Sequence, residues 1–397
     1  MIATANFTLH PADDSNPALV SAIARRIANS DRRRIPFVDY MDMVLYEPNY
    51  GYYATNTANI GPLGDFFTSP HLGADFGELL AEQFVQMWEI LNCPVPFTLL
   101  ELGAGQGLLA ADILEYLSYR YPDFFAALDY VIVERSAALR EEQQRQLPSH
   151  FPFRWTTLNE IPANSITGCC FSNELIDALP VHQLEIQDGQ LREIYLTTDL
   201  VEITDEPSTP KLAEYFDLVK IKLPSSAYPN GYRTEVNLAA LEWLSAIALR
   251  LERGYLLTID YGYSSERYYN PARHGTLQCY YRHQHHNNPY IHIGRQDITA
   301  HVDFTALELW GEKCGLNRVG LTQQGLFLMA LGLGERIAAI SNTHQVGLNI
   351  QAVLRRRDAL HQLIDPLGLG GFGVLVQSKG LKVAQRQHHL KGLSFPQ

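Results

Sequence analysis

The chain has 397 residues, of which 46% are hydrophobic and 19% charged, and its formal net charge is −12. Length and composition are those of a globular protein with one large domain or two. The acidic balance argues against a nucleic-acid partner, because phosphate contacts require clustered Lys and Arg, and it suits a cationic partner better.

The cysteines and the first residues of the chain indicate the cellular compartment in which the protein is expected. The five cysteines include no C-x-x-C pair, which argues against a disulfide framework or a zinc knuckle and fits a reducing compartment. No apolar run approaches the roughly 18–20 residues of a membrane span. The first residues have the pattern of neither a signal peptide nor a transit peptide. We therefore expect a cytoplasmic protein without a membrane partner.

The first 95 residues are predicted to form a helical N-terminal domain. Apolar residues recur at helical spacing in SNPALVSAIARRIANS (15–30), with Ser15 or Asn16 as N-cap, in IPFVDYMDMVLY (35–46) and in GADFGELLAEQFVQMWEIL (73–91). A loop rich in Gly, Asn, Thr and Tyr separates the second of these helices from the third. We expect this domain to act as a cap that contributes to the active site.

From Phe97 onward, short apolar strands alternate with helices, which indicates βαβ units and a parallel sheet covered on both faces. This predicts a second domain over residues 96–385. Two insertions interrupt it, at about 181–230 and 261–299. The first contains a hairpin that turns at Asp188-Gly189, and the second is a long loop rich in Tyr and His. Residues 386–397 are expected to be a flexible tail.

The stretch LLELGAGQGLLAADIL (99–114) places three glycines, Gly103, Gly105 and Gly107, between a strand and a helix. A dinucleotide fingerprint would need its third glycine at position 108, which is Leu108. The spacing G-x-G-x-G after an acid resembles instead the first motif of class I S-adenosylmethionine-dependent methyltransferases. In that interpretation Glu101 holds the cationic amino end of the methyl donor.

Two further strand ends carry polar residues that suit a nucleoside and its reaction partner. Glu134 ends the next strand, where a carboxylate accepts hydrogen bonds from both ribose hydroxyls. Asn173, Glu174 and Asp177 follow a later strand at the same expected edge of the sheet, where ligands of such folds bind. The alternative is that Asn173 or Asp177 only caps a following helix.

A family resemblance becomes specific at this point. The chain resembles the MidA-like family, which includes mitochondrial complex I assembly methyltransferases and bacterial relatives. Six segments carry the resemblance: YEPNYGYY (46–53), GDFFTSPHLGADFGE (64–78), the glycine stretch, SNELIDALPVHQ (172–183), LLTIDYGY (256–263) and DITAHVDFTAL (297–307). The resemblance implies a Rossmann-like, mostly parallel seven-stranded sheet with a helical cap, S-adenosyl-L-methionine as cofactor, and an accessible protein arginine as acceptor.

A guanidinium has a pKa above about 12 and no free lone pair, so carboxylates must hold it for methyl transfer. We expect Glu174 and Asp177 to do so, followed by Asp65 and then Glu47. Thr68 and Ser69 are expected to donate to the carboxylate of the donor, and Asn173 is expected to contact the donor as well. Tyr residues are candidates for the wall of the site, although core packing is the expected role of each taken alone: Tyr52, Tyr53 and Tyr261.

Other interpretations remain open from the residues. A cluster of histidines (His283, His285, His286 and His292) suggests zinc, but it lacks ligand spacing and accompanying acids, so we expect a polar loop and no metal. Asp303 is either a site residue or a helix cap. The fold also suits a catalytically weak assembly factor, a small-molecule methyltransferase or, against the evidence of Leu108, a nicotinamide-dependent oxidoreductase. A homodimer is a further expectation.

Overall fold

The computed structural model describes residues 14–55, 68–282, 284–341 and 350–394. Contacts divide the chain into two units, each made of three segments. Unit 1 consists of Met1–Phe66, Ile176–Trp243 and Gly262–Trp310, and unit 2 consists of Phe67–Leu175, Leu244–Tyr261 and Gly311–Gln397. Helices α8 (Leu238–Arg250) and α10 (Phe304–Lys313) each begin in unit 1 and end in unit 2.

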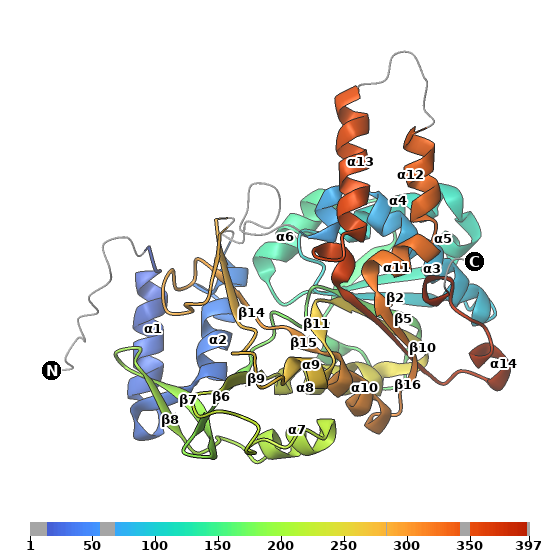
Figure 1. The fold of residues 1–397 in the computed structure, drawn as a ribbon. Helices are drawn as coiled ribbons and strands as arrows, with labels where there is room; N and C mark the ends of the chain where they lie inside the picture. The colour runs from blue at the N-terminus through green and yellow to red at the C-terminus, as the bar shows by residue number, and fades with distance from the viewer. Residues whose placement is uncertain (1–13, 56–67, 283, 342–349, 395–397) are drawn as a thin grey trace. The chain divides into compact units, whose positions relative to one another are not determined.

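Unit 2 contains a seven-stranded sheet (Figure 1). Its strands are β2 (Phe97–Leu102), β3 (Leu128–Val133), β4 (Phe153–Thr156), β5 (Ile166–Asn173), β10 (Leu251–Asp260), β16 (Asn317–Gln323) and β17 (Gly373–Lys379). Their order is β16–β17–β10–β5–β2–β3–β4, and only β17 runs antiparallel to its neighbours. The predicted α/β fold with a mostly parallel seven-stranded sheet is confirmed.

Strand β5 shows why this sheet forms. Its sequence ITGCCFSN is buried along nearly its whole length, as expected of a central parallel strand covered on both faces. Gly168 of β5 lies opposite Gly254 of β10, and a Cβ on Gly254 would collide with the Gly168 carbonyl oxygen. Glycine at this pair therefore allows the two central strands to approach each other.

Helices surround the sheet within unit 2. They are α3 (Asp75–Ile90), α4 (Leu108–Arg120), α5 (Pro122–Ala127), α6 (Ala137–Gln146), α11 (Gln324–Ala330), α12 (Leu333–Ser341), α13 (Ile350–Ile364) and α14 (Val383–Arg386), with short 3-10 helices η3 (Ser69–Leu72), η4 (Leu158–Glu160), η5 (Leu369–Gly371) and η6 (Lys391–Leu393). The core combines aromatic side chains from helix and sheet. Phe84 of α3 and Phe171 of β5, for example, have ring centroids 5.0 Å apart.

The contacts divide the chain differently from the predicted boundary at residue 95. Helix α3 was expected in the N-terminal domain, but its apolar face packs on the sheet of unit 2. The expected flexible tail also differs from the structure over its described part. Leu390 is buried, and the backbone N–H of Gly392 donates to Gln83 of α3 at 2.9 Å. Burial of these few residues against α3 is sufficient to order the segment.

Unit 1 combines small sheets with helices. Its helices are α1 (Pro17–Ala28), α2 (Phe37–Tyr46), α7 (Lys211–Val219) and α9 (Ser265–Tyr268), with 3-10 helices η1 (Asp31–Arg33) and η2 (Tyr52–Ala54). One sheet contains β1 (Arg34–Pro36), β6 (His182–Gln187), β7 (Gln190–Thr197), β8 (Glu202–Asp205) and β9 (Arg233–Val236). The predicted hairpin is β6–β7, and Asp188 and Gly189 both have positive φ, as its two-residue turn requires.

The segment predicted as a long loop over 261–299 is more ordered than expected. It contains α9 and a three-stranded sheet of β12 (Gln278–Tyr281), β13 (Gln284–His286) and β14 (Asp297–Thr299). A further strand pair joins β11 (Gly262–Tyr263) to β15 (Val302–Asp303). The β12–β14 and β11–β15 pairings join residues far apart in sequence, so the local pattern did not reveal them, whereas β12 and β13 are neighbours along the chain.

Candidate functional site

The glycine loop of unit 2 connects β2 to α4. Gly103, Gly105 and Gly107 have φ of +70°, +52° and +84°, a region that L side chains rarely adopt. A Cβ on Gly103 would lie 2.7 Å from Leu175 Cδ1, whereas nothing lies within 4 Å of a Cβ on Gly105. Two requirements therefore act together: Gly103 fits a tight turn, and Gly105 leaves the loop backbone open to a ligand.

Glu134 directly follows β3 and is 7% exposed. Its Oε1 accepts the backbone N–H of Ser136 at 2.9 Å, and its Oε2 accepts Gln143 Nε2 at 3.3 Å. Burial raises the pKa of this carboxyl, while those donors oppose the shift. A carboxylate has about four lone-pair positions, so it can accept two hydroxyls in addition to these donors.

Gln143 of α6 contacts the predicted donor-binding residues, and we propose it as a site residue that the sequence reasoning missed. Its buried amide nitrogen donates to the Gly105 carbonyl at 2.8 Å as well as to Glu134. Its amide oxygen accepts Trp155 Nε1 at 2.7 Å, which fixes the orientation of the amide. In the sequence Gln143 is one of three glutamines in EEQQRQ, and no local signal distinguishes it.

Glu101 is 3% exposed in the middle of the sheet. Tyr130 OH donates to its Oε2 at 2.6 Å, and no cation pairs with it among the described residues. Burial, opposed by this hydrogen bond, raises the pKa of Glu101 to about 7. A buried carboxyl with only a neutral donor is suited to a cationic ligand group, which would restore its ionised form.

The end of β5 carries Asn173 and Glu174. Asn173 Nδ2 donates to Glu174 Oε1 at 3.1 Å, and the backbone N–H of Ser69 lies 3.4 Å from the same oxygen. Glu174 has φ of +51°. A non-glycine residue in this conformation costs roughly 1–2 kcal/mol and is enriched at functional sites. The buried Asn173 Oδ1 has no hydrogen-bond partner among the described residues, so it remains able to accept a ligand donor.

The segment before α3 is tied to this region of unit 2. Thr68 Oγ1 lies 2.7 Å from His71 Nδ1, and His71 Nε2 lies 3.2 Å from Oε1 of Gln106, in the glycine loop. Ser69 Oγ accepts Gln324 Nε2 at 3.0 Å. Both hydroxyls that were predicted to bind the donor carboxylate therefore have protein partners, and that role stays a prediction.

The residues of unit 2 fit S-adenosylmethionine in charge and hydrogen bonding. Glu101 suits its ammonium group, Glu134 suits its ribose hydroxyls, and the open backbone at Gly105 allows close approach. Neither carboxylate suits a pyrophosphate, because Glu101 before the loop and Glu134 after β3 would both repel phosphate oxygens. The fit supports a nucleoside with a cationic amino-acid end.

Asp177 lies in unit 1 and is 6% exposed. Its carbonyl oxygen accepts the backbone N–H of Ala300 at 2.9 Å. Residues 174–180 form a turn and no helix, so the alternative of a helix cap does not apply to Asp177 or Asn173. Burial and then the charge of Asp297 raise the pKa of Tyr53 well above its usual value, and Asp177 adds to this shift. Asp177 therefore lies near an aromatic side chain of η2.

The remaining predicted residues have other environments. Glu47 Oε2 accepts the backbone N–H groups of Asn49 and Tyr50 at 2.8 and 2.7 Å, so it stabilises the turn after α2, and its catalytic role stays a prediction. Tyr52 is fully buried in unit 1, and Tyr261 packs on Phe372 in unit 2. Asp65 and His283 lie outside the described residues.

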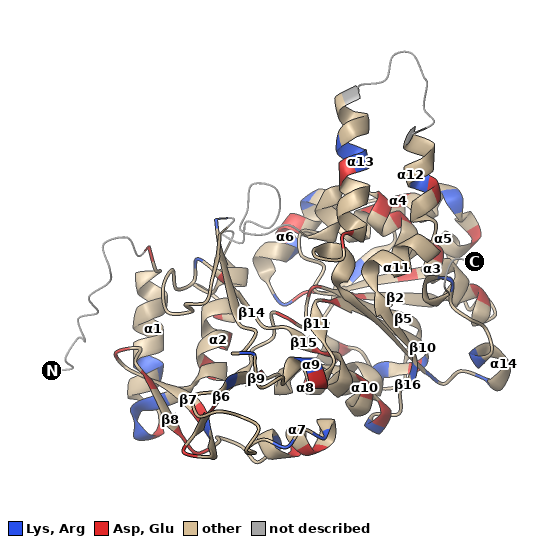
Figure 2. Ribbon diagram, viewed as in Figure 1, with Lys and Arg blue, Asp and Glu red and all other residues tan. Residues whose placement is uncertain are grey.

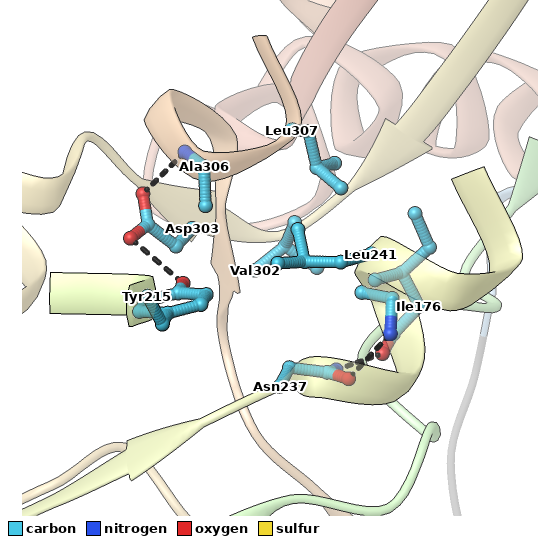
Figure 3. A pocket seen from close by; sticks show the side chains of 9 residues that line it. Ile176, Tyr215, Asn237, Leu241, Val302, Asp303, Ala306 and Leu307 are labelled. Atoms are coloured by element: carbon cyan, nitrogen blue, oxygen red, sulfur yellow. Dashed lines mark hydrogen bonds between the residues drawn. The ribbon is translucent and has the colours of Figure 1, made fainter. Parts of the chain in front are cut away.

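Asp303 is a structural residue in unit 1. Figure 3 shows its carboxylate bonded to the backbone N–H of Ala306 and to Tyr215 OH, at 3.2 and 3.0 Å. The first bond caps α10. The adjoining cavity of about 10 Å³ holds no more than one water, so it is a packing void. In the described part of the chain, no group of three His, Cys, Asp or Glu side chains is arranged to hold a metal ion.

Relatives of the chain are named methyltransferases. The chain is 30% identical over 367 residues to the Drosophila melanogaster protein arginine methyltransferase NDUFAF7 homolog, mitochondrial, covering 85% of this chain and 79% of that protein. It is 27% identical over 338 residues to protein arginine methyltransferase NDUFAF7, mitochondrial, of Homo sapiens, covering 77% and 72%.

These relatives correct the predicted location. Their names place them in mitochondria, so the prediction of a cytoplasmic protein is wrong. Sparse cysteines indicate a reducing environment and do not identify the compartment. Over the residues that the structure covers, no helix has both the length and the apolar character needed to cross a membrane.

A solved structure and a family model also match this chain, and both are described as methyltransferases. A Burkholderia thailandensis protein bound to S-adenosyl-homocysteine superposes with a TM-score of 0.81 at 29% identity, covering 94% of each chain. Residues 79–322 match the family described as "Putative S-adenosyl-L-methionine-dependent methyltransferase". The glycine loop, Glu101 and Glu134 lie within this match. The chain therefore belongs to the MidA-like family of class I methyltransferases that use S-adenosyl-L-methionine.

Proposed function

We propose that this methyltransferase transfers the methyl group to an arginine side chain of a protein acceptor. The observation that carries the proposal is Glu174, a carboxylate held in a left-handed conformation at the carboxyl end of β5. The printed names of the relatives, protein arginine methyltransferases, support the same acceptor class.

A guanidinium must be held and kept electron-rich if one of its nitrogens is to attack. When bound, the donor supplies an electrophilic methyl group on its sulfonium. The carboxylate of Glu174 is oriented through Oε1 by Asn173 and by the backbone of Ser69. An oriented carboxylate accepts N–H groups of the guanidinium, aligns it, and keeps electron density on the attacking nitrogen.

Asp177 is proposed as the second carboxylate that acts on the acceptor, because it follows Glu174 by three residues and is buried in unit 1. An N-terminal helical cap that contributes to the active site is likewise part of the proposal. The homodimer and the exclusion of nucleic acid stay predictions.

The test uses Asp177→Asn, which removes the charge and keeps the shape of the side chain. We expect methyl transfer to be lost and S-adenosylhomocysteine to bind within about twofold of the unchanged protein, because the residues proposed to bind the donor belong to unit 2. Mass spectrometry of a protein extract, incubated with enzyme and a donor carrying a deuterated methyl group, measures labelled arginine. Asp199→Asn, an exposed position of unit 1, is the matched control.

Labelled arginine formed by Asp177→Asn at the normal rate would remove this residue from the proposal. Label found only in small molecules, with none in protein arginine, would overturn the proposed acceptor class.

A further inference from the structure

Two arginines of unit 1 converge on one tyrosine. The guanidinium carbon of Arg267 lies 4.2 Å from the centroid of the Tyr263 ring, and that of Arg273 lies 4.3 Å from it. The ring of His301 stacks on the same tyrosine, with centroids 4.8 Å apart and planes 16° apart. Four side chains from β11, α9 and two neighbouring segments thus form one cluster, which we call the Tyr263 cluster.

The positive charge of the Tyr263 cluster is not neutralised by the protein. Among the described residues, no carboxylate forms an ion pair with Arg267 or Arg273. Asp303 is the register partner of Tyr263, but its carboxylate is bonded to Ser265 and Tyr215. Two guanidinium groups without a partner repel each other, and this arrangement is typical of a site that receives an anion.

Several other arginines of the same unit are paired with carboxylates. Arg233 contacts Glu185 at 2.7 Å and Glu202 at 2.8 Å, and Arg34 pairs with Asp205. The chain as a whole is acidic, with a net charge of −12, so carboxylates are not scarce. Leaving two neighbouring arginines without one therefore requires an explanation other than composition.

His301 does not add to the positive charge. Burial lowers its pKa to about 4, and the charges of Arg273 and Arg267 act in the same direction. The ring is therefore neutral near pH 7 and serves as a flat surface against Tyr263. The charges of both guanidinium groups therefore contribute to the lowered pKa of His301.

The Tyr263 cluster is linked to Asp177 through backbone contacts within unit 1. Ala300, whose N–H donates to the Asp177 carbonyl at 2.9 Å, directly precedes His301. The next two residues form β15, which pairs with β11 and so with Tyr263. The proposed acceptor carboxylate and the two arginines thus belong to one continuous piece of structure.

We propose that Arg267 and Arg273, held over Tyr263, form a binding site for a carboxylate of the acceptor protein, from an Asp or Glu close to the arginine that is methylated. This proposal rests on the proposed function, because the carboxylate belongs to the same acceptor protein as the methylated arginine. Guanidinium groups suit a carboxylate because each offers a rigid fork of N–H donors. Aromatic stacking holds the forks in place at little entropic cost.

The experiment measures binding to the full chain by calorimetry, with saturating S-adenosylhomocysteine present. The probes are three short peptides: one with a central arginine flanked by glutamates, the same peptide with glutamines, and the glutamate peptide with citrulline in place of arginine. We expect the glutamate peptide to bind about fivefold more tightly than the glutamine peptide, a preference that decreases with added salt.

The variant Arg267→Gln/Arg273→Gln should abolish this preference, and Arg267→Lys/Arg273→Lys should retain part of it. The control Arg25→Gln/Arg192→Gln makes the same change in net charge at two other positions of unit 1 and should keep the full preference. If the glutamine variant does not fold, as judged by circular dichroism, the lysine variant and the single variant Arg273→Gln provide the comparison.

Equal affinity for the glutamate and glutamine peptides, or no detectable binding of either, would overturn the site. A preference that survives in the glutamine variant would do the same. Weakened binding of S-adenosylhomocysteine in that variant would show that the carboxylate belongs to the donor, which also overturns the proposal. Failure of the proposed function has a different signature: the citrulline peptide would bind as tightly as the arginine peptide while the glutamate preference remained.

Discussion

Glu134 is the residue on which we expect recognition of the donor ribose to depend most directly. It is buried, and each of its oxygens already accepts one donor from the protein, so it is held in a fixed orientation. We expect Glu134→Ala to weaken S-adenosylhomocysteine binding by roughly 1–3 kcal/mol, because two charge-assisted hydrogen bonds are lost. Calorimetric titration measures this change. Glu141→Ala, at an exposed position of α6, should bind normally, and normal binding by Glu134→Ala would remove Glu134 from the site.

We expect Glu101 to make donor binding depend on pH. Its pKa is raised by burial to about 7, from an ordinary value of 4.5. Below that pH the folded protein keeps the carboxyl protonated, and above it the carboxylate can pair with the donor's ammonium. Affinity for S-adenosylhomocysteine should therefore rise as the pH increases from about 6 to about 8. Titrations across this range provide the measurement.

Two variants test that assignment of the pH dependence. Glu101→Gln should bind more weakly and show a flat profile over the same range. Tyr130→Phe removes the hydrogen bond that lowers the pKa of Glu101, so the midpoint should move to higher pH. If the affinity of Glu101→Gln for S-adenosylhomocysteine still changed with pH, the pH dependence would come from another group.

At the scale of elements, α6 holds the glycine loop in place through Gln143. One amide bridges the Gly105 carbonyl and the Glu134 carboxylate, and Trp155 of β4 orients it. We expect Gln143→Ala to weaken donor binding by about 1–2 kcal/mol while leaving kcat at saturating donor unchanged. Gln144→Ala, on the exposed side of the same helix, is the matched control. Equal donor affinity in the two variants would limit Gln143 to a packing role.

Helices α12 and α13 are both anchored to α3 through Asp75, and Arg336 of α12 also pairs with Glu78 of α3. The carboxylate of Asp75 accepts a hydrogen bond from the guanidinium of Arg336 at 2.8 Å and two from that of Arg356 at 2.7 and 2.8 Å. Figure 2 shows basic residues along α13. Burial raises the pKa of Asp75, but hydrogen bonds to Arg356 and Arg336 prevail and lower it. We expect Asp75→Asn to reduce the free energy of unfolding by about 1–2 kcal/mol at pH 7, a modest figure because the cluster is partly exposed.

The pH dependence of that loss follows from the sign of the shift. A lowered pKa contributes stability above the unfolded value of about 3.8, and this contribution disappears as the pH falls through the folded value. Urea unfolding curves of the variant and the unchanged protein should therefore converge toward pH 3. A constant difference at all pH values would indicate a packing defect instead.

At the scale of the whole molecule, donor binding should stabilise the chain against unfolding. Each unit is made of three separate segments, so neither is a continuous piece of sequence. A ligand at 100 times its Kd adds about 2.7 kcal/mol to the free energy of unfolding. We expect this gain from S-adenosylhomocysteine, measured by urea unfolding, and a much smaller gain for Glu134→Ala at the same concentration. An unchanged midpoint with the unaltered protein would contradict the assigned donor site.

The local features of this protein could be predicted because their causes lie within a few residues. Positive φ at Gly103, Gly105 and Gly107 requires residues without a Cβ, and the Asp188-Gly189 turn fixes the hairpin by the same physics. The continuous apolar run of β5 indicates a strand buried on both faces. Each of these signals depends on spacing along the chain, so reading the sequence was sufficient.

The sequence by itself determined the class of fold and the glycine loop, and it placed Glu101 and Glu134 near that loop, where their role in donor binding stays a prediction, because strand ends and turns follow from local periodicity. Only the tertiary structure decided that α3 packs on the sheet of unit 2, that Gln143 bridges the loop to Glu134, and that Arg267 and Arg273 meet over Tyr263. The packing of α3 and the bond from Gln143 to Gly105 join residues distant in sequence, and which distant surfaces meet is set by burial and charge summed over the folded chain. Arg267 and Arg273 lie close to Tyr263 in sequence, but in this irregular segment packing decides which side chains meet, and no local periodicity predicts it.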